Sequence, residues 1–330
     1  MLAASPALAR FPLVAAPTPL QRAYRLEAAL GGPALYLKRD DLTGLARAGN
    51  KARKLELLVG DALERGADVI LTGGGPASNH CYATAVAASV AGLGCVLLYY
   101  GSPPKDEPPN LAFARDVEAD VRFTGDLRRE SVEDGLETLA QQLRSAGRRP
   151  YVIPRGGATP VGSAAYGLAV GELAAQLKDA GVAPTTVVVA TGSCGTQAGL
   201  VAGTVAGGYP WHVVGASVSR PQDESSERVL RLARGAAALC GWPEPTAADV
   251  DVRDARGPGY GVPSADGQAA ALLSVRREGL LLDPVFTAKA MALVIRLAAG
   301  DTAGPILFWH TGGVPTPLGG HNAGRQNAAT

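Results

Sequence analysis

The sequence has too little charge to attract a large polyanionic partner, and no apolar run that could cross a membrane. Only 18% of the 330 residues are charged, and the net charge is +1. This balance gives no general field that would attract nucleic acid or an anionic membrane surface. Glycine or charge interrupts every apolar stretch before it reaches bilayer-spanning length, which argues against a transmembrane helix. We therefore expect no nucleic-acid or membrane partner, and any anion site must be local.

Cysteine is scarce, and its spacing shows no motif. The four cysteines lie far apart, without a CxxC pair, at Cys81, Cys95, Cys194 and Cys240. Neither a zinc ribbon nor a dense disulfide framework is therefore indicated, and we expect no metal site. Free thiols fit a reducing compartment. The apolar residues 1–9 are few and lack the positive start of a signal peptide, so we expect a cytoplasmic protein.

Glycine and proline are abundant instead, with 42 and 24 residues, in a chain that is 47% hydrophobic. Short apolar runs alternate with longer Ala/Leu-rich helical patterns, which is typical of βαβ units. The runs predict strands at 68–72, 95–100, 121–124, 151–154, 186–190, 212–218 and 306–310. The helical patterns lie at 82–93, 110–118, 131–146, 162–180, 197–205, 226–240, 265–277 and 287–299. The uniformly apolar strand 186–190 indicates a parallel sheet covered on both faces, so the expected fold class is open α/β.

A glycine-rich turn, Ala-Thr-Gly-Ser-Cys-Gly-Thr at 190–196, follows this buried strand and runs into a helical pattern. Backbone N–H groups at such a turn, together with the positive end of the helix, can bind a phosphate without a basic residue. The turn matches neither GxxxxGK[ST] nor GxGxxG, so neither a nucleotide triphosphatase nor a dinucleotide site is indicated. A purely structural turn would explain the glycines equally well.

Other turns bring polar side chains to the ends of predicted strands. Ser78, Asn79 and His80 open a helix after the strand 68–72, where they form either a polar rim or an ordinary helix cap. Tyr260 stands between glycines at 257–261, and Thr311 follows the last strand. The carboxyl ends of parallel strands converge on one crevice, although Tyr260 alone would fit a half-buried loop aromatic.

Lys51 lies at a predicted helix start within Gly-Asn-Lys-Ala-Arg-Lys at 49–54. An amine that forms a Schiff base needs a fixed position and a lowered pKa, and a partly desolvated lysine at a turn has both. The plainer alternative is a solvated cap, because most lysines are exposed.

Taken together, these segments resemble a family of pyridoxal-phosphate enzymes, the 1-aminocyclopropane-1-carboxylate deaminases and D-cysteine desulfhydrases, within the tryptophan-synthase-β-like fold type II group. The matching segments follow the family order from Phe11 to about Pro315: 17–20, 37–44, 49–56, 78–80, 154–157, 191–196, 257–261, 282–285 and 310–313. The resemblance implies two open twisted α/β domains with the cofactor in the cleft between them. Residues 1–48 and 163–318 would form the larger domain and 49–162 the smaller, and 319–330 would be a flexible tail. It also implies a homodimer.

The resemblance assigns roles to residues around pyridoxal 5'-phosphate. Lys51 would form the Schiff base, Asn79 would bond the phenolic oxygen, and Thr287 and Thr311 would lie at the pyridine nitrogen and the ring. The phosphate would be held by Gly192, Ser193, Cys194, Gly195 and Thr196.

On the substrate side, Ser78, Asn79 and His80 would contact the amino acid, with Ser78 near its carboxylate or in proton transfer. Tyr260 is a candidate acid or base group, and Phe286 a substrate neighbour. The expected catalytic residues are therefore Lys51, Ser78 and Tyr260.

The chain also departs from the family. The deaminase branch has Leu-Asp-Pro-Val-Tyr-Glu where residues 282–287 end in Phe286 and Thr287, so ring opening lacks both its phenol and its carboxylate. Thr287 agrees with the desulfhydrase branch, which however has tyrosine at Phe286 and usually glutamine at Ala77. These changes make the substrate side roomier and less polar, which favours an S-substituted cysteine. Cys194 replaces a family glycine, and we expect it to be tolerated with its side chain turned away from the amides.

The predicted reaction is α,β-elimination from cysteine or an S-substituted cysteine, giving pyruvate, ammonia and sulfide or thiol. Three alternatives stay open: ring opening of 1-aminocyclopropane-1-carboxylate, amino-acid racemisation, and a cofactor-binding protein without turnover.

Overall fold

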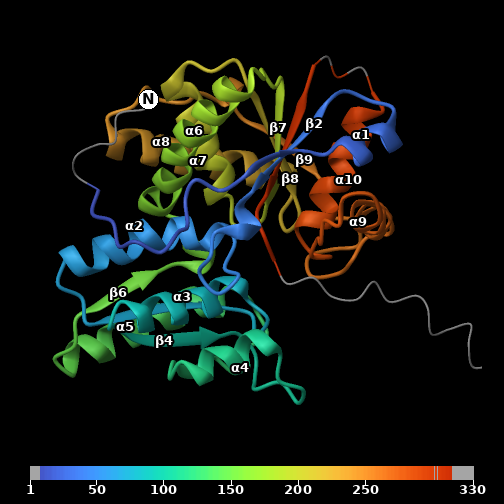
Figure 1. Cartoon of the computed structure of the whole chain (residues 1–330). Coiled ribbons are helices and arrows are strands. Elements are labelled where there is room, and N and C mark those ends of the chain that lie inside the picture. The colour runs from blue at the N-terminus through green and yellow to red at the C-terminus, as the bar shows by residue number, and fades with distance from the viewer. Residues whose placement is uncertain (1–7, 301, 303, 314–330) are drawn as a thin grey trace, which may run out of the picture.

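The computed structural model describes residues 8–300, 302 and 304–313. Its larger sheet has six strands in the order β1-β2-β10-β7-β8-β9 (Figure 1). All neighbouring strands in it are parallel except the pair of β1 and β2. The strands are β1 (Leu20–Arg22), β2 (Leu35–Arg39), β7 (Thr186–Thr191), β8 (His212–Ser217), β9 (Asp251–Asp254) and β10 (Ile306–His310).

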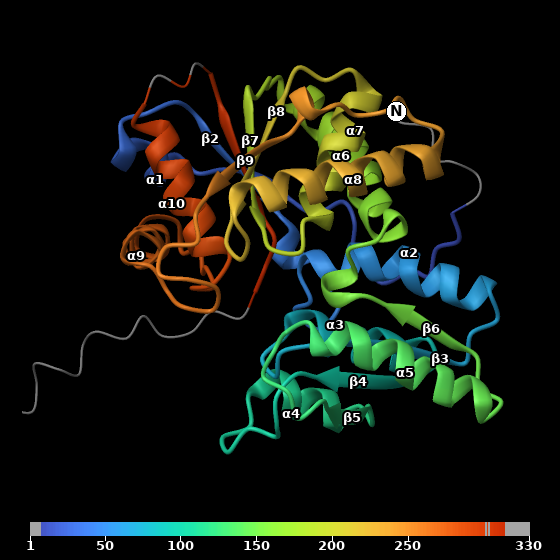
Figure 2. The same cartoon turned by 180° about the vertical axis from the view of Figure 1, so that it is seen from behind.

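The smaller sheet has four parallel strands in the order β5-β4-β3-β6. They are β3 (Val69–Gly74), β4 (Gly94–Tyr99), β5 (Asp120–Phe123) and β6 (Pro150–Ile153). Every residue of β3 is buried, as expected of a central strand that is covered on both faces. Figure 2 shows this sheet and its helices below the six-stranded sheet.

Helices cover both faces of each sheet. They are α1 (Tyr24–Leu30), α2 (Asn50–Glu64), α3 (Asn79–Val90), α4 (Pro109–Asp116), α5 (Ser131–Ser145), α6 (Pro160–Ala180), α7 (Gly195–Gly207), α8 (Gln222–Cys240), α9 (Ala265–Glu278) and α10 (Thr287–Ala298). In β10, Leu307 and Trp309 join the core under α6, α7 and α8, while Ile306 and Phe308 join the core under α1, α9 and α10. The alternation follows from the two-residue period of a strand.

Helix α2 lies between the two sheets and packs against α6 above and α3 below. A buried charged network fixes it to the larger sheet. The Asp40 carboxylate accepts hydrogen bonds from Nε and Nη2 of Arg53, from the Tyr166 hydroxyl and from the Trp309 indole. Because Arg53 is two residues after Lys51, this network also sets where the start of α2 lies.

The division of the chain into domains at 1–48, 49–162 and 163–318 stays a proposal. It is supported by the four-stranded sheet being drawn from 69–153 and the six-stranded sheet from segments on either side of it. The predicted tail at 319–330 lies outside the described residues. No described helix is long and apolar enough to cross a membrane.

Candidate active site

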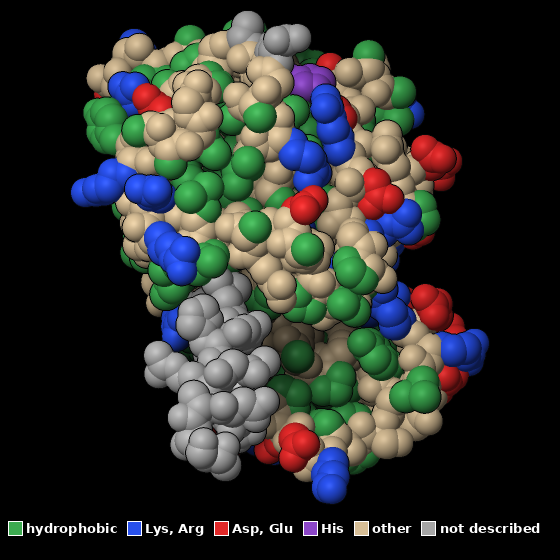
Figure 3. All heavy atoms as spheres, turned by 90° about the vertical axis from the view of Figure 1, so that its right-hand side faces the viewer, with side chains coloured by type: hydrophobic (Ala, Val, Ile, Leu, Met, Phe, Trp, Pro, Cys, Tyr) green, Lys and Arg blue, Asp and Glu red, His purple; other side chains and the backbone are tan. Residues whose placement is uncertain are grey.

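A cavity of about 540 Å³ opens between the two sheets, and Figure 3 shows the hollow with hydrophobic side chains inside it. Of the predicted site residues, it is lined by Lys51, Ser78, Asn79, His80, Gly192, Ser193, Cys194, Thr196, Tyr260, Phe286 and Thr311. Gly195 and Thr287 are not among the lining residues. The crevice thus brings together strand ends from both sheets, as the open parallel topology requires.

Lys51 is held at the start of α2 by a close backbone approach. Gly49, with φ +57°, lies so near the end of β10 that a Cβ on it would be 2.3 Å from the Thr311 carbonyl oxygen. That oxygen accepts a 2.9 Å hydrogen bond from the Asn50 amide. Burial lowers the pKa of Lys51 to about 8, and the Asp283 carboxylate opposes this shift. About a tenth of the amine is therefore unprotonated at pH 7 and able to act as a nucleophile.

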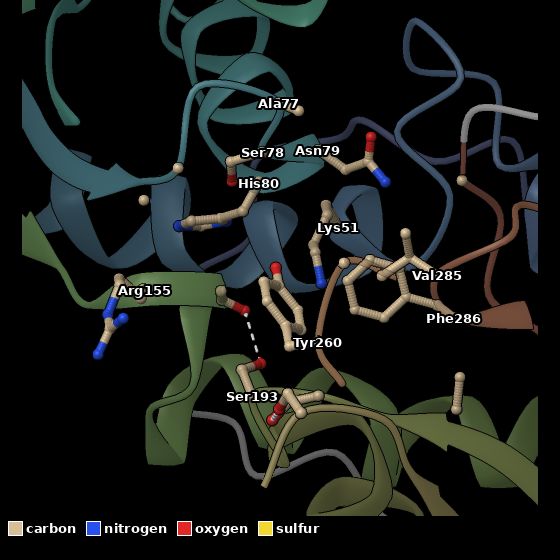
Figure 4. A pocket seen from close by; sticks show the side chains of 18 of the residues that line it. Lys51, Ala77, Ser78, Asn79, His80, Arg155, Ser193, Tyr260, Val285 and Phe286 are labelled. Carbon is tan, nitrogen blue, oxygen red and sulfur yellow. Dashed lines mark hydrogen bonds between the residues drawn. The ribbon is translucent and has the colours of Figure 1, made fainter. Parts of the chain in front are cut away.

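Asn79 is oriented by a residue that the sequence did not single out. Its Oδ1 accepts a 2.8 Å hydrogen bond from Nδ2 of Asn110, which also donates to the Ala77 carbonyl at 3.0 Å. The Asn79 amide nitrogen is thus left to donate, and Figure 4 shows it turned towards the side of Lys51 and Phe286. Asn110 is buried near the start of α4, and its Pro-Pro-Asn context carried no functional signal.

The glycine-rich turn joins β7 to α7, and a second lysine faces it. A Cβ on Gly195 would be 3.0 Å from Lys54 Nζ. Lys54 is 1% exposed, and within the described part of the chain its Nζ has one hydrogen bond, 3.3 Å to the Gly156 carbonyl. Burial and the charge of Lys51 lower its pKa well below the usual value. A buried amine without a carboxylate partner fits an anion in the turn. The sequence holds one indication of this role for Lys54: it follows Lys51 by three residues, so the two lysines share a face of the helix.

Contacts from outside hold the turn in shape. The Gly192 carbonyl accepts hydrogen bonds from the Ser219 hydroxyl at 2.9 Å and Arg220 Nη1 at 2.8 Å, and Thr196 Oγ1 accepts one from Asn50 Nδ2 at 3.0 Å. Cys194 has φ +74°, a left-handed conformation that costs a non-glycine residue about 1–2 kcal/mol. Its side chain is 2% exposed and belongs to the core cluster beneath α7 and α8.

His80 is neutral and fixed. The Thr72 hydroxyl donates its proton to the Ile153 carbonyl at 2.6 Å, so at 3.0 Å it accepts from Nε2 of His80. Burial first, then the charges of Lys51 and Lys54, lower the pKa of His80 well below 6.5. Ser78 caps α3, because its Oγ accepts a 3.2 Å hydrogen bond from the Cys81 amide. Ser78 and His80 both line the pocket, but the Nε2 proton of His80 is already used in the hydrogen bond to Thr72.

Tyr260 and Phe286 face Lys51 from the larger sheet (Figure 4). Their ring centroids are 6.2 Å apart in an edge contact, and Phe286 also lies on Gly192, where a Cβ would be 3.0 Å from its ring. Burial raises the pKa of the Tyr260 phenol, while the charge of Arg129 opposes the rise. Tyr260 therefore stays protonated near neutral pH and can donate a proton.

Thr287 is fully buried at the start of α10. Its hydroxyl donates to the Asp283 carboxylate at 2.6 Å and accepts from the Asp283 amide at 2.8 Å. Since its single proton is already committed, Thr287 cannot donate to a pyridine nitrogen in this arrangement. Its predicted place at that nitrogen stays a prediction.

Comparison with known proteins decides which family this site belongs to. The family model described as "Pyridoxal-phosphate dependent enzyme" matches residues 12–312. The chain belongs to this family. It is 42% identical over 318 residues to a putative 1-aminocyclopropane-1-carboxylate deaminase of Pyrococcus abyssi, covering 93% of each chain. It is 41% identical over 325 residues to a D-cysteine desulfhydrase of Salmonella choleraesuis, covering 95% of this chain and 98% of the relative.

Among solved structures, the crystal structure of an ACC deaminase homologue matches with a TM-score of 0.87 at 36% identity, covering 94% of this chain and 93% of that one. The protein is thus a fold type II pyridoxal-phosphate enzyme, as the sequence predicted. Its residues fit the cofactor: a partly neutral Lys51, an Asn79 amide nitrogen that can donate, and a glycine turn faced by Lys54, which pairs with no carboxylate among the described residues. Among the described residues, no group of three or more His, Cys, Asp or Glu could hold a metal ion.

Proposed function

We propose that this pyridoxal-phosphate enzyme is a lyase that removes the β-substituent of cysteine or an S-substituted cysteine, releasing pyruvate, ammonia and sulfide or thiol. The observation that carries the proposal is the pairing across the pocket of a partly neutral amine, Lys51, with a protonated phenol, Tyr260 (Figure 4). One group can take a proton from Cα and the other can give one to the departing sulfur. The D-cysteine desulfhydrase relative supports this assignment.

Bound pyridoxal phosphate supplies the electron sink for the charge that develops at Cα. The chain supplies the positions and the protons. The Lys51 amine takes the Cα proton, the electron pair of the Cβ–S bond leaves with sulfur, and the Tyr260 hydroxyl protonates the sulfur. The Ser78 hydroxyl lies at the α3 N-terminus, where the substrate carboxylate meets the positive helix end. One water then converts the unsaturated product to pyruvate and ammonia.

Residues around the cofactor hold it for this chemistry. Lys54 and the amides of the 192–196 turn would bind its phosphate, and the Asn79 amide would donate to its phenolic oxygen. Thr311 lies beside Lys51 through the Asn50 contact and would border the ring. His80, neutral and bonded to Thr72, would line the substrate side without taking part in proton transfer.

Ring opening of 1-aminocyclopropane-1-carboxylate is the second candidate, favoured by the name of the Pyrococcus relative. It is opposed by Phe286, which brings no hydroxyl to the pocket. Racemisation and a loss of turnover are further outcomes of the same test. In either case the protein would still bind the cofactor, but no keto acid would be released from the amino acid.

The first test is the visible absorption spectrum of the purified protein. The protein is then mixed separately with D- and L-cysteine, S-substituted cysteines and 1-aminocyclopropane-1-carboxylate, and the keto acid that is released is measured. We expect an absorption band that Lys51→Ala abolishes, and pyruvate with sulfide or thiol from one of the cysteines. Lys105→Ala, at an exposed lysine in the loop before α4, is the matched control. Cyclopropane turnover would establish the second candidate, 2-oxobutanoate being its keto acid, and inversion without keto acid would indicate a racemase.

We also propose that the enzyme is a cytoplasmic homodimer. The homodimer rests on the resemblance to the family. The location is supported by Cys81, Cys95, Cys194 and Cys240, which are all free thiols, as a reducing compartment would keep them. Light scattering during size-exclusion chromatography measures the mass of the particle and so tests the homodimer. Fractionation of the native cells, followed by detection of the protein in each fraction, tests the location.

A further inference from the structure

The pocket carries more positive charge than its own carboxylates neutralise. Its described lining includes one acidic residue, Glu133, and five cations: Lys51, Arg129, Arg155, Arg220 and Arg228. Two of the arginines have carboxylate partners. Arg155 is 2.5 Å from Glu133, and Arg220 is 2.7 Å from Glu224. Arg129 and Arg228 form no ion pair with any described residue.

The two unpaired arginines face different parts of the pocket. Arg228 Nε donates to the Ser193 carbonyl at 3.2 Å, so it belongs to the phosphate turn. Its pKa is lowered by burial and by the neighbouring charges of Arg220, Arg231 and Arg155. A cofactor phosphate bound in the turn would neutralise part of this positive charge, and Arg228 and Lys54 would both help to hold it.

Arg129 lies on the substrate side. Its guanidinium carbon is 4.3 Å from the centre of the Tyr260 ring, the residue proposed to protonate the leaving group. The charge of Arg155, which pairs with Glu133, also opposes the rise in the Tyr260 pKa. A guanidinium stacked on a ring keeps its in-plane N–H donors free for a second partner. Neither the cofactor phosphate nor the proposed carboxylate position at Ser78 uses those donors.

We propose that Arg129 binds a negatively charged group on the β-substituent of the substrate. The favoured substrates would be cysteine or serine derivatives whose leaving group carries a sulfonate, phosphate or carboxylate. This rests on the proposed lyase function and names its substrate class. Phe286 and Ala77 leave the room that such a substituent needs.

The chemistry is balanced without a further reactant. The Cα proton passes to Lys51, and the Cβ–S or Cβ–O electron pair leaves with the anionic substituent, which takes a proton from Tyr260 or departs as its anion. Hydrolysis consumes one water and gives pyruvate and ammonia.

The test compares S-sulfocysteine and O-phosphoserine with β-chloroalanine, each as both enantiomers. β-Chloroalanine is the reference because its β-substituent is uncharged but also leaves readily. A faster reaction of the anionic substrates therefore cannot be explained by a better leaving group alone. We expect Arg129→Gln to lower the ratio of kcat/KM for the anionic over the neutral substrate by about 10- to 100-fold, the effect of one charge-assisted hydrogen bond. The loss should lie mainly in KM.

Arg128→Gln is the matched control. Arg128 is the adjacent arginine, its side chain is 71% exposed, it pairs with Asp126 at 2.6 Å, and it is not a lining residue. The ratio should stay within about 2-fold in this variant. A ratio equally unaffected by Arg129→Gln, or a wild type that eliminates chloride while rejecting every anionic substrate, would overturn the inference and leave the lyase assignment standing.

A binding measurement separates the two proposals if no substrate is turned over. The inert probes are 2-amino-3-phosphonopropionate and neutral 2-aminobutyrate, titrated by calorimetry into the holoenzyme. Tighter binding of the phosphonate that Arg129→Gln removes supports the anion site even where the lyase function fails. Equal affinity for the two probes, or a phosphonate preference that Arg129→Gln leaves intact, contradicts it.

Discussion

The guanidinium carbon of Arg129 lies 4.3 Å from the centre of the Tyr260 ring, and both residues line the pocket. Arg129 precedes α5 beside the four-stranded sheet, whereas Tyr260 follows β9 of the six-stranded sheet. The edge of Phe286 meets the same tyrosine at 6.2 Å. A half-exposed cation–π contact of this kind contributes about 0.5–1 kcal/mol, which favours the observed position of the Tyr260 ring.

Replacing the phenol of Tyr260 tests its role as proton donor. Tyr260→Phe keeps the ring between Arg129 and Phe286 but removes the hydroxyl. We expect kcat for elimination from cysteine to fall about 10²- to 10³-fold, within the range of general acid catalysis, with the absorption band of the bound cofactor unchanged. Steady-state kinetics with keto-acid detection measures this. Tyr24→Phe, at an exposed tyrosine on α1, is the control, and retention of a third of the activity in Tyr260→Phe would contradict the role.

The lowered pKa of Lys51 predicts how cofactor capture depends on pH. The neutral amine is the nucleophile, so the rate at which the apoprotein binds pyridoxal phosphate covalently should rise from about pH 6, reach half its maximum near pH 8 and level off above about pH 9. Asp283→Asn removes the charge that raises this pKa and should move the curve to lower pH. Stopped-flow absorbance follows the reaction. A curve that still climbs above pH 10 would show an ordinary exposed lysine.

Lys54 is expected to affect the cofactor and the apoprotein in opposite directions. Lys54→Met removes a buried amine that pairs with no carboxylate of residues 8–300 or 304–313, so the apoprotein should be as stable as wild type or more stable. The affinity for pyridoxal phosphate should fall about 10- to 100-fold, because a charged contact to phosphate is lost. Equilibrium titration and thermal unfolding check the two effects. Lys178→Met, at an exposed lysine near the end of α6, should change neither.

The buried network under α2 predicts a large stability effect. Asp40 is fully buried and accepts from Arg53, Tyr166 and Trp309. Asp40→Asn removes one of the two carboxylates that pair with the buried Arg53 and leaves Glu172 as the other. We expect a loss of about 2–4 kcal/mol in the free energy of unfolding, because the donors of Arg53, Tyr166 and Trp309 lose a charged acceptor. Denaturant titration measures it. Asp126→Asn, which breaks an exposed pair with Arg128, should cost less than about 1 kcal/mol, and similar losses in both variants would contradict this account.

Strong patterns in the sequence predicted the central strands well. The strand expected at 186–190 is β7 (Thr186–Thr191), and the one at 306–310 is β10, because a strand buried on both faces must be apolar throughout. Short edge strands β1 and β9 went unpredicted, as did β2. Lys38 in β2 is fully buried, and its amine finds its partners only in the folded chain. It pairs with the Glu172 carboxylate and donates to the Thr18 carbonyl and to Gln176, both 2.7 Å away.

Helix starts depended on single polar contacts. Helix α3 begins at Asn79, three residues before the predicted 82–93, because the Ser78 hydroxyl caps it through the Cys81 amide. The Ala/Leu pattern marks only the apolar face of a helix. A cap acts through one hydrogen bond, and such a bond does not show in periodicity.

The fold class, the family and the lysine at the start of α2 could all be predicted from residue patterns and from motifs in a fixed order. The side chains that surround this lysine in the pocket became known from the folded chain alone. Lys54 lies against Gly195, Asn110 donates a hydrogen bond to Asn79, and Arg129 stacks on Tyr260. Each pair joins segments that are distant in the chain, and burial, charge and direction at such contacts are properties of the packed molecule rather than of any segment.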